Sequence, residues 1–168
     1  MSNPRTILVV DDIPLMRALL IRYVTALRIN DEGLRINDEG LRIGDEGDES
    51  GSAPLEALQA CDGEEALGIL RSTPVDLIFL DLMMPVMDGL TFLARKKEEA
   101  RLRDIPVIVC SARGDPEALE RATELGAQAY IVKPFTLQSV ERSIREALQN
   151  QLAGSLSPGT RSLSDSQS

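Results

Sequence analysis

Four short, mainly apolar runs in this chain each stop at a polar residue, and this pattern constrains the fold most. Such runs, separated by helical stretches, are typical of buried strands in a parallel sheet. Ligands bind outside the carboxyl ends of parallel strands, so we expect three carboxylates, a hydroxyl and an ammonium group at one rim. The runs and their final residues are Thr6–Val10 with Asp11 and Asp12, Val75–Leu80 with Asp81, Pro106–Cys110 with Ser111, and Ala127–Val132 with Lys133.

The segments between these runs have the signals of helices. Pro14 suits a first helical turn that Asp12 could cap, and Asp62 with Glu65 forms a capping-box pattern. Gly126 is a typical residue just beyond a helix end, and Thr136 is a good cap for the last helix. With a weaker strand at residues 55–60, strands and helices alternate five times. This alternation predicts the α/β class with a parallel sheet.

Composition excludes several classes of function. A net charge of −9 argues against direct contact with nucleic acid, and the absence of histidine excludes a phosphohistidine or a histidine-based metal site. Two cysteines are too few for a disulfide framework, and no apolar run reaches the length of a membrane span. Since the N-terminus also lacks a signal-peptide pattern, we expect a cytoplasmic protein without membrane contact.

Two segments stand outside the alternating pattern. Residues 153–168 are rich in serine and predict a disordered tail, which leaves 1–152 as the folded domain. Residues 27–54 are an acidic insertion between the first helix and the second strand, with eight acids and three arginines. The insertion contains three seven-residue repeats, LRINDEG twice and then LRIGDEG.

The repeat is no coiled-coil heptad, because its Leu and Ile lie two residues apart. Two residues span about 200° on a helix but share one face of a strand. Each repeat therefore resembles a three-residue strand followed by a four-residue turn, although strands this short are marginal alone. We expect first a disordered or loosely ordered linker, second a small β-meander, and only third a calcium site.

Asp81 is the best candidate for a nucleophile at the rim. A carboxylate that attacks phosphorus forms an acyl phosphate, a reactive species suited to a transient signal. Asp11 and Asp12 repel each other unless a cation lies nearby, and Mg²⁺ prefers such oxygen ligands. The ligands would be Asp11 or Asp12, Asp81 and the backbone carbonyl of Met83. The simpler alternatives are that Asp81 caps a loop and that Asp12 caps a helix, and the latter is compatible with metal binding.

Lys133 and Ser111 complete the chemistry expected at this rim. Lys133 can neutralise phosphoryl oxygens, and the Lys133–Pro134 peptide bond is a candidate for the cis form. Ser111 can donate a hydrogen bond to a phosphoryl oxygen. Taken singly, each would be an ordinary surface residue, and Tyr130 would be an ordinary half-buried strand aromatic. Catalysis here would consist of positioning and electrostatic stabilisation of an in-line transfer.

Taken together, these motifs resemble the receiver domain of two-component response regulators over residues 5–26 and 55–150. The resemblance implies a flavodoxin-like five-stranded sheet of order 2-1-3-4-5, bound Mg²⁺, and phosphate donated by a sensor histidine kinase or a histidine phosphotransfer protein. It also implies signalling through the surface of the fourth helix, fifth strand and fifth helix. The matching positions are the acid pair Asp11 and Asp12, phosphoacceptor Asp81, the sequel from Met84 to Gly89, switch residues Ser111 and Tyr130, and Lys133 with Pro134.

We therefore expect a stand-alone receiver that signals to an unknown downstream protein and is not itself an enzyme, beyond its own phosphorylation and dephosphorylation. An aspartyl-phosphate phosphatase of the haloacid dehalogenase type would instead need Asp-x-Asp after the first strand, where this chain has Asp-Asp-Ile. A third possibility is a receiver-like scaffold that is never phosphorylated. The insertion should emerge far from Asp81, so we expect residues 28–53 to be dispensable for phosphoryl transfer.

Overall fold

The parallel sheet expected from the apolar runs is the centre of the molecule. The computed structural model describes residues 5–30, 33–36, 52–112 and 115–154. Its main strands run parallel in the order β4-β1-β5-β6-β7, which is the expected 2-1-3-4-5 order. These strands are β1 (Arg5–Val10), β4 (Ala53–Ala60), β5 (Leu77–Asp81), β6 (Val107–Ser111) and β7 (Ala129–Val132).

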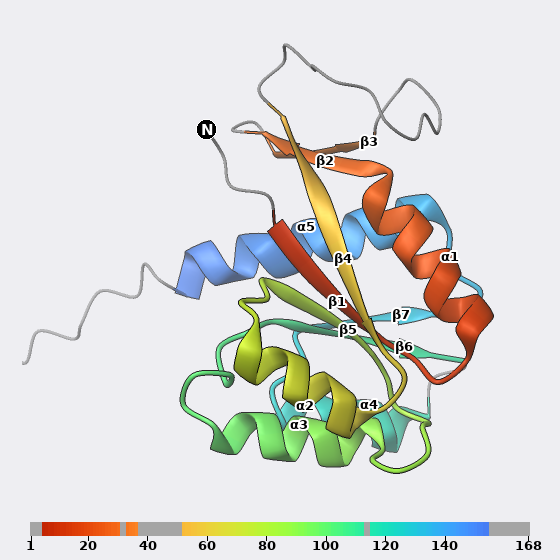
Figure 1. Ribbon diagram of the computed structural model, residues 1–168, viewed down its shortest axis with the longest axis vertical. Helices are drawn as coiled ribbons and strands as arrows, with labels where there is room; N and C mark the ends of the chain where they lie inside the picture. The colour runs from red at the N-terminus through yellow and green to blue at the C-terminus, as the bar shows by residue number, and fades with distance from the viewer. Residues whose placement is uncertain (1–4, 31–32, 37–51, 113–114, 155–168) are drawn as a thin grey trace, which may run out of the picture.

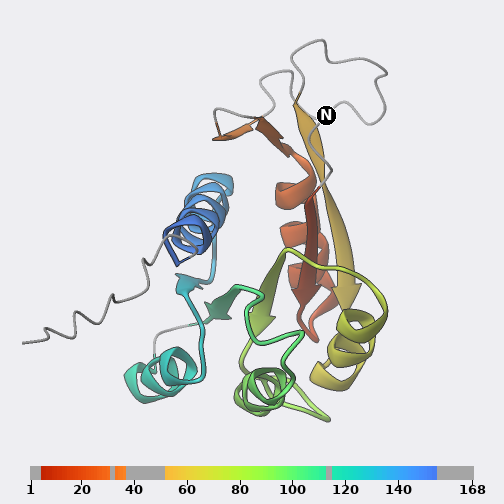
Figure 2. The ribbon, with the colours of Figure 1, turned by 90° about the vertical axis from the view of Figure 1, so that its left-hand side faces the viewer.

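Helices cover both faces of this sheet (Figures 1 and 2). On one face, α1 (Pro14–Thr25) and α5 (Leu137–Gly154) pack on a core that includes Ile7 and Val9. On the other face, α2 (Gly63–Ser72), α3 (Gly89–Glu98) and α4 (Pro116–Glu124) pack on a core that includes Leu8 and Val10. Successive residues of β1 thus serve opposite cores, as the alternation of side chains along a strand requires.

Part of the repeat adds two strands that the sequence analysis ranked second. β2 (Leu27–Asn30) and β3 (Gly33–Ile36) form an antiparallel hairpin, and β2 pairs antiparallel with β4, so the sheet has seven strands. The expectation of a disordered linker is therefore wrong for these residues. The predicted tail of residues 153–168 begins two residues too early, because Ala153 and Gly154 belong to the last helix, Leu137–Gly154. Residues 37–51 and 155–168 lie outside the described residues.

Burial of apolar side chains explains why the hairpin forms. In the register of the hairpin Leu27 lies opposite Ile36 and Ile29 opposite Leu34, and the Leu-x-Ile pattern puts Leu27 and Ile29 on one face of β2. Leu27 and Leu34 are buried in the same core as α5, and the Arg145 side chain donates to the Leu34 carbonyl at 3.0 Å. The sheet edge and α5 supply the apolar surface that an isolated short hairpin lacks.

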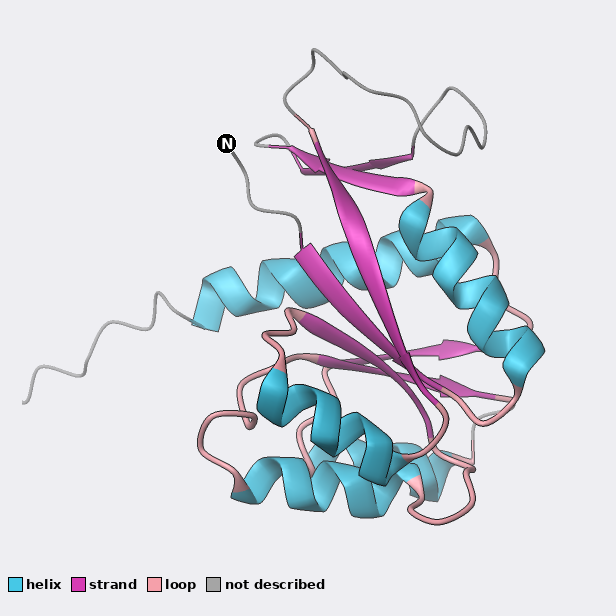
Figure 3. Cartoon of the chain, in the orientation of Figure 1, coloured by secondary structure: helices cyan, strands magenta, loops and turns pink. Residues whose placement is uncertain are grey.

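The hairpin and the rim of polar residues lie at opposite ends of the sheet. Figure 3 shows β2 and β3 beside the beginning of β4, whereas Asp81 ends β5 at the other end of the parallel strands. The insertion therefore emerges far from Asp81, as the sequence predicts.

Candidate functional site

Asp81 is held at the centre of the site because it is the last residue of a strand that is buried throughout. Its side chain is nearly inaccessible, and Oδ1 accepts a hydrogen bond from the Met83 N–H at 3.1 Å. Burial raises the pKa of this carboxyl, the Met83 N–H and the Lys133 ammonium lower it, and the Asp11 carboxylate raises it again. The net shift is upward, so the site disfavours the Asp81 charge in the absence of further cations.

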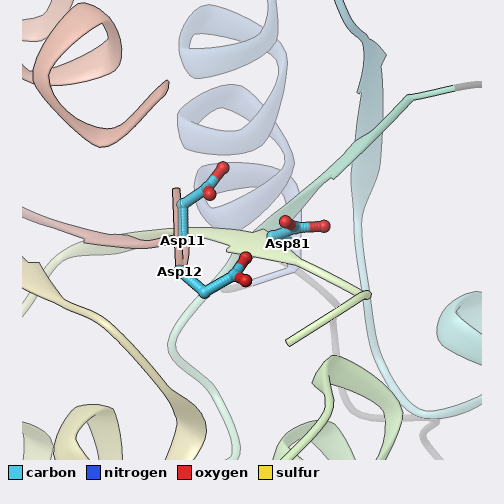
Figure 4. Close-up of side chains that lie close together, drawn as sticks. All are labelled: Asp11, Asp12 and Asp81. Carbon is cyan, nitrogen blue, oxygen red and sulfur yellow. The ribbon is translucent and has the colours of Figure 1, made fainter. Parts of the chain in front are cut away.

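Asp11 follows β1 and presents its carboxylate to the same space (Figure 4). Its Oδ1 accepts from the Ile13 N–H at 2.8 Å, and its backbone N–H donates to the Ala60 carbonyl at 3.2 Å. Asp11 is almost completely buried, with 1% of its surface exposed. A carboxylate this deep needs a cationic partner, which Lys133 provides.

Lys133 bridges the two buried carboxylates. Its Nζ lies 2.8 Å from Asp11 Oδ2 and 3.3 Å from Asp81 Oδ2, while its backbone N–H donates to the Ser111 carbonyl at 2.7 Å. Burial lowers the pKa of Lys133, but Asp11 and Asp81 together outweigh burial and the net shift is upward. Lys133 therefore stays protonated, and the expected cis form of the Lys133–Pro134 peptide bond is confirmed.

Asp12 does not cap α1, so the expectation of a capping role is wrong. The cap residue is Ile13, and no side-chain cap hydrogen bond is present among the described residues. Pro14 offers no N–H to a cap, and the Asp11 carboxylate takes the Ile13 N–H instead. The buried Oδ1 of Asp12 finds no hydrogen-bond partner among the described residues.

These features fit a divalent cation. Oxygens of Asp11, Asp12 and Asp81 lie within 4.8 Å of one another, and one lysine leaves two of the three negative charges uncompensated. A buried carboxylate oxygen without a partner, as in Asp12, is the group that a metal ion would satisfy. The three carboxylates expected at the rim are thus brought together, whereas ligation by the Met83 carbonyl stays a prediction.

The two switch residues lie on the neighbouring strands. Ser111 ends β6 and is partly buried beside the Lys133 backbone. Tyr130, in β7, is 60% exposed, so it is more exposed than the half-buried strand aromatic that we considered as its simpler role. Its ring is thus available to change position without unpacking a core.

Two residues near the site were not assigned a role of their own from the sequence. Gly89 begins α3 so close to the strand that an added Cβ would lie 2.6 Å from the Asp81 carbonyl oxygen. Arg17, in the first turns of α1, donates from Nη1 to the Asp11 carbonyl at 2.6 Å. An arginine five residues after an acid pair is a weak sequence signal, and only the fold shows that this side chain binds the Asp11 carbonyl.

Within the described part of the chain, no helix is both long enough and apolar enough to span a membrane.

Comparisons with known proteins point to one family. The family model described as "Response regulator receiver domain" matches residues 51–145. The phosphate regulon transcriptional regulatory protein PhoB of Klebsiella pneumoniae is 38% identical over 102 residues, which are 61% of this chain and 43% of that protein. The probable transcriptional regulator ycf27 of Cyanophora paradoxa is 40% identical over 94 residues, 56% of this chain and 38% of that protein. The chain thus spans about two fifths of the length of these relatives.

Solved structures show the same fold. The chemotaxis protein CheY4 of Vibrio cholerae superposes with a TM-score of 0.66 at 22% identity, over 86% of this chain and 98% of that one. NtrX from Brucella abortus gives a TM-score of 0.69 at 25% identity, over 90% of this chain and 28% of that one. With a family model that matches more than half of its length, this chain belongs to the response regulator receiver domains.

Proposed function

We propose that Asp81 accepts a phosphoryl group from a phosphohistidine of a sensor histidine kinase or a histidine phosphotransfer protein. The observation that carries this proposal is the buried Asp81 carboxylate 3.3 Å from the Lys133 ammonium, beside two further carboxylates. An Asp81 oxygen attacks phosphorus, the P–N bond to the imidazole breaks, and the departing nitrogen keeps the electron pair. The products are an aspartyl phosphate and a free histidine.

The residues of this chain position and neutralise the transferred group. The Lys133 ammonium already lies beside the Asp81 carboxylate and can stabilise the negative charge of the phosphoryl oxygens after transfer. Asp11, Asp12 and Asp81 would hold Mg²⁺, with the Met83 carbonyl as a further ligand; when bound, the ion supplies positive charge to the phosphoryl oxygens. Water later attacks phosphorus, the P–O bond to Asp81 breaks, and inorganic phosphate and the Asp81 carboxylate are the products. The chain is thus a phosphoacceptor with self-catalysed steps, not an enzyme that turns over a separate substrate.

The phosphorylated state would be transmitted by Ser111 and Tyr130. A hydrogen bond from Ser111 to the phosphoryl group favours one of two conformations, and Tyr130 moves inward with it. Tyr130 lines a hollow of about 570 Å³ between α4, β7 and α5, which also includes Ala122, Arg142 and Ser143. This surface supports signalling through contact with another protein, as expected for the family.

The downstream partner is proposed only as a class. The relatives are named as transcriptional regulators, so a DNA-binding protein or segment is one candidate for the downstream partner. A net charge of −9 for the whole chain argues against direct nucleic-acid contact by this chain. A cytoplasmic location accords with a donor of the histidine kinase class.

The test is phosphorylation by acetyl phosphate with Mg²⁺, followed by intact-mass measurement. Wild type should gain one phosphoryl group, Asp81→Asn should gain none, and labelling should require Mg²⁺. Asp104→Asn, a change at an exposed aspartate, serves as the matched control and should label normally. Equal labelling of wild type and Asp81→Asn would refute the assignment. Steady hydrolysis of small phosphate esters would instead favour a phosphatase.

A further inference from the structure

Arg17 connects the loop that follows β1 to the last residues of β4 before the rim. Its Nη1 donates to the Asp11 carbonyl at 2.6 Å, and its Nε donates to Gln59 Oε1 at 3.2 Å. Asp11 belongs to the connection between β1 and α1, whereas Gln59 belongs to β4, one residue before that strand ends. A single side chain in α1 is thereby fixed to the backbone of the acid pair and to the neighbouring strand.

The Asp11 and Asp12 side chains differ in the hydrogen bonds that hold them. The Asp11 carboxylate is fixed by Ile13 and Lys133, but Oδ1 of Asp12 has no hydrogen-bond partner among the described residues. The Asp11 carbonyl is part of the planar peptide unit that leads to the Asp12 Cα. A hydrogen bond that orients this plane therefore also sets the direction in which the Asp12 side chain begins.

We propose that Arg17 is a positioning residue for the cation site, which holds the Asp11–Asp12 peptide so that the Asp12 carboxylate stays directed at the metal. The proposal rests on the proposed function only in assigning Mg²⁺ to this cluster. The Arg17 hydrogen bonds go to the Asp11 carbonyl and to Gln59, and Arg17 is not one of the candidate metal ligands. Its guanidinium is suited to the task because its donors form a rigid fork that reaches two acceptors, whereas a lysine ammonium is a single flexible charge.

Charge and positioning predict opposite effects of removing Arg17. Loss of a positive charge near three carboxylates would, by electrostatics alone, make Mg²⁺ bind more tightly. Loss of a positioning contact makes Mg²⁺ bind more weakly, and contacts behind metal ligands typically account for 10- to 100-fold in affinity. The sign of the change therefore separates the two effects.

The experiment is calorimetric titration of the full chain with Mg²⁺, for wild type and variants. Arg17→Ala should weaken Mg²⁺ binding about tenfold. Arg17→Lys should recover part of the loss, and Gln59→Ala should produce a smaller loss, because one of the two contacts survives in each. Arg22→Ala, at an exposed residue of the same helix, is the control for charge and helix propensity and should bind Mg²⁺ as wild type does.

A second readout excludes a merely structural role. Phosphorylation of Arg17→Ala by acetyl phosphate should require more Mg²⁺ but approach the wild-type rate at saturating Mg²⁺. Unchanged or tighter Mg²⁺ binding would overturn the proposal, as would a rate that stays low at saturating Mg²⁺. If Arg17→Ala no longer melts cooperatively, Arg17→Lys and Gln59→Ala decide by the same criteria. Failure of Asp81 to accept phosphate would refute the proposed function and leave the Mg²⁺ comparison intact.

Discussion

At the scale of single residues, the phosphoacceptor is packed against the start of the following helix. The Gly89 N–H donates to the Leu82 carbonyl at 3.0 Å, and no side chain fits between them. A Cβ at Gly89 would lie 2.6 Å from the Asp81 carbonyl oxygen and 2.7 Å from Leu82 Cα. Both contacts are with backbone, so an added methyl group must displace the strand end that carries Asp81.

Gly89→Ala should therefore destabilise the fold and impair the site together. We expect a loss of about 1–3 kcal/mol in the free energy of unfolding, the usual range for overpacking, and slower phosphorylation at Asp81. Gly68→Ala is the matched control, because no described heavy atom lies within 4 Å of its added Cβ and the residue is exposed on α2. It should gain up to about 1 kcal/mol from helix propensity. Urea unfolding measures the free energy of unfolding of both variants. Equal changes in Gly89→Ala and Gly68→Ala would contradict the steric argument.

Burial of Asp81 makes the stability of the metal-free protein depend on pH. Because the folded pKa of Asp81 is raised, the folded state holds its proton more readily than the unfolded chain. The stability from this group is present at low pH and is lost as pH rises through the folded pKa. Asp81→Asn should thus melt above wild type in EDTA at pH 7, by a margin that shrinks toward pH 4, about the usual pKa of aspartate.

Mg²⁺ should reverse this order, because the cation binds wild type with all three carboxylates intact and stabilises it by mass action. Thermal melts in EDTA and in Mg²⁺ provide the measurement. A lower melting temperature for Asp81→Asn in EDTA at pH 7 would mean that the Lys133 ion pair outweighs the cost of burial.

The sequence was most informative about residues at strand ends. Asp11, Asp81 and Lys133 converge as predicted, because their places in the chain fix their places on the sheet. Asp12 was assigned a cap that it does not make, since hydrogen-bond competition between neighbouring residues is not visible in a pattern. Arg17 was missed for a similar reason: its acceptor is a backbone carbonyl, which every residue possesses.

At the scale of elements, the hairpin β2–β3 extends the core of α1 and α5. Leu34 is 4% exposed and lies in the cluster that contains Val140 and Ile144 of α5. The alternation within Leu-x-Ile correctly predicted a shared face on a strand. The preference for a disordered or loosely ordered linker failed for residues 27–30 and 33–36, because it considered the repeat alone and not the open edge of β4 beside it.

Leu34→Ala should therefore cost about 2 to 4 kcal/mol of unfolding free energy, the range for a buried leucine. Leu15→Ala, at a leucine that is 70% exposed on α1, is the control and should change stability by less than about 0.5 kcal/mol. Chemical denaturation measures both. If the two variants were equally stable, the hairpin would contribute nothing to the core.

At the scale of the whole molecule, the rim with Asp81 and the β2–β3 hairpin lie at opposite ends of one sheet. Five of its strands followed from the sequence, since the apolar runs and their order determine a parallel sheet. The other two did not, because pairing of β2 with β4 depends on tertiary contacts that periodicity cannot reveal.

Deletion of residues 28–53, with a short Gly-Ser bridge, should leave the rate of phosphorylation near normal in the folded protein. The described part of the segment, β2 and β3, pairs with the beginning of β4 at the end of the sheet opposite Asp81, and charges are screened within about 8 Å at physiological salt. The melting temperature should fall, because Leu34 is removed from the core. Acetyl phosphate labelling and thermal melts test both parts. A large loss of rate in a protein that melts cooperatively would show that the insertion influences the rim.

Tandem copies of a short unit are prone to gain or lose a copy when DNA strands slip during replication. The hairpin draws on the first unit and on part of the second, and the leucine–arginine–isoleucine core is the same in all three. A lineage that lost residues 34–40 would bring Leu41, Arg42 and Ile43 to the places of Leu34, Arg35 and Ile36, directly after the same Asn-Asp-Glu-Gly sequence. The reading frame survives as well, because seven codons are removed whole. The protein would therefore keep the residues of the β2–β3 hairpin after the loss of one repeat unit.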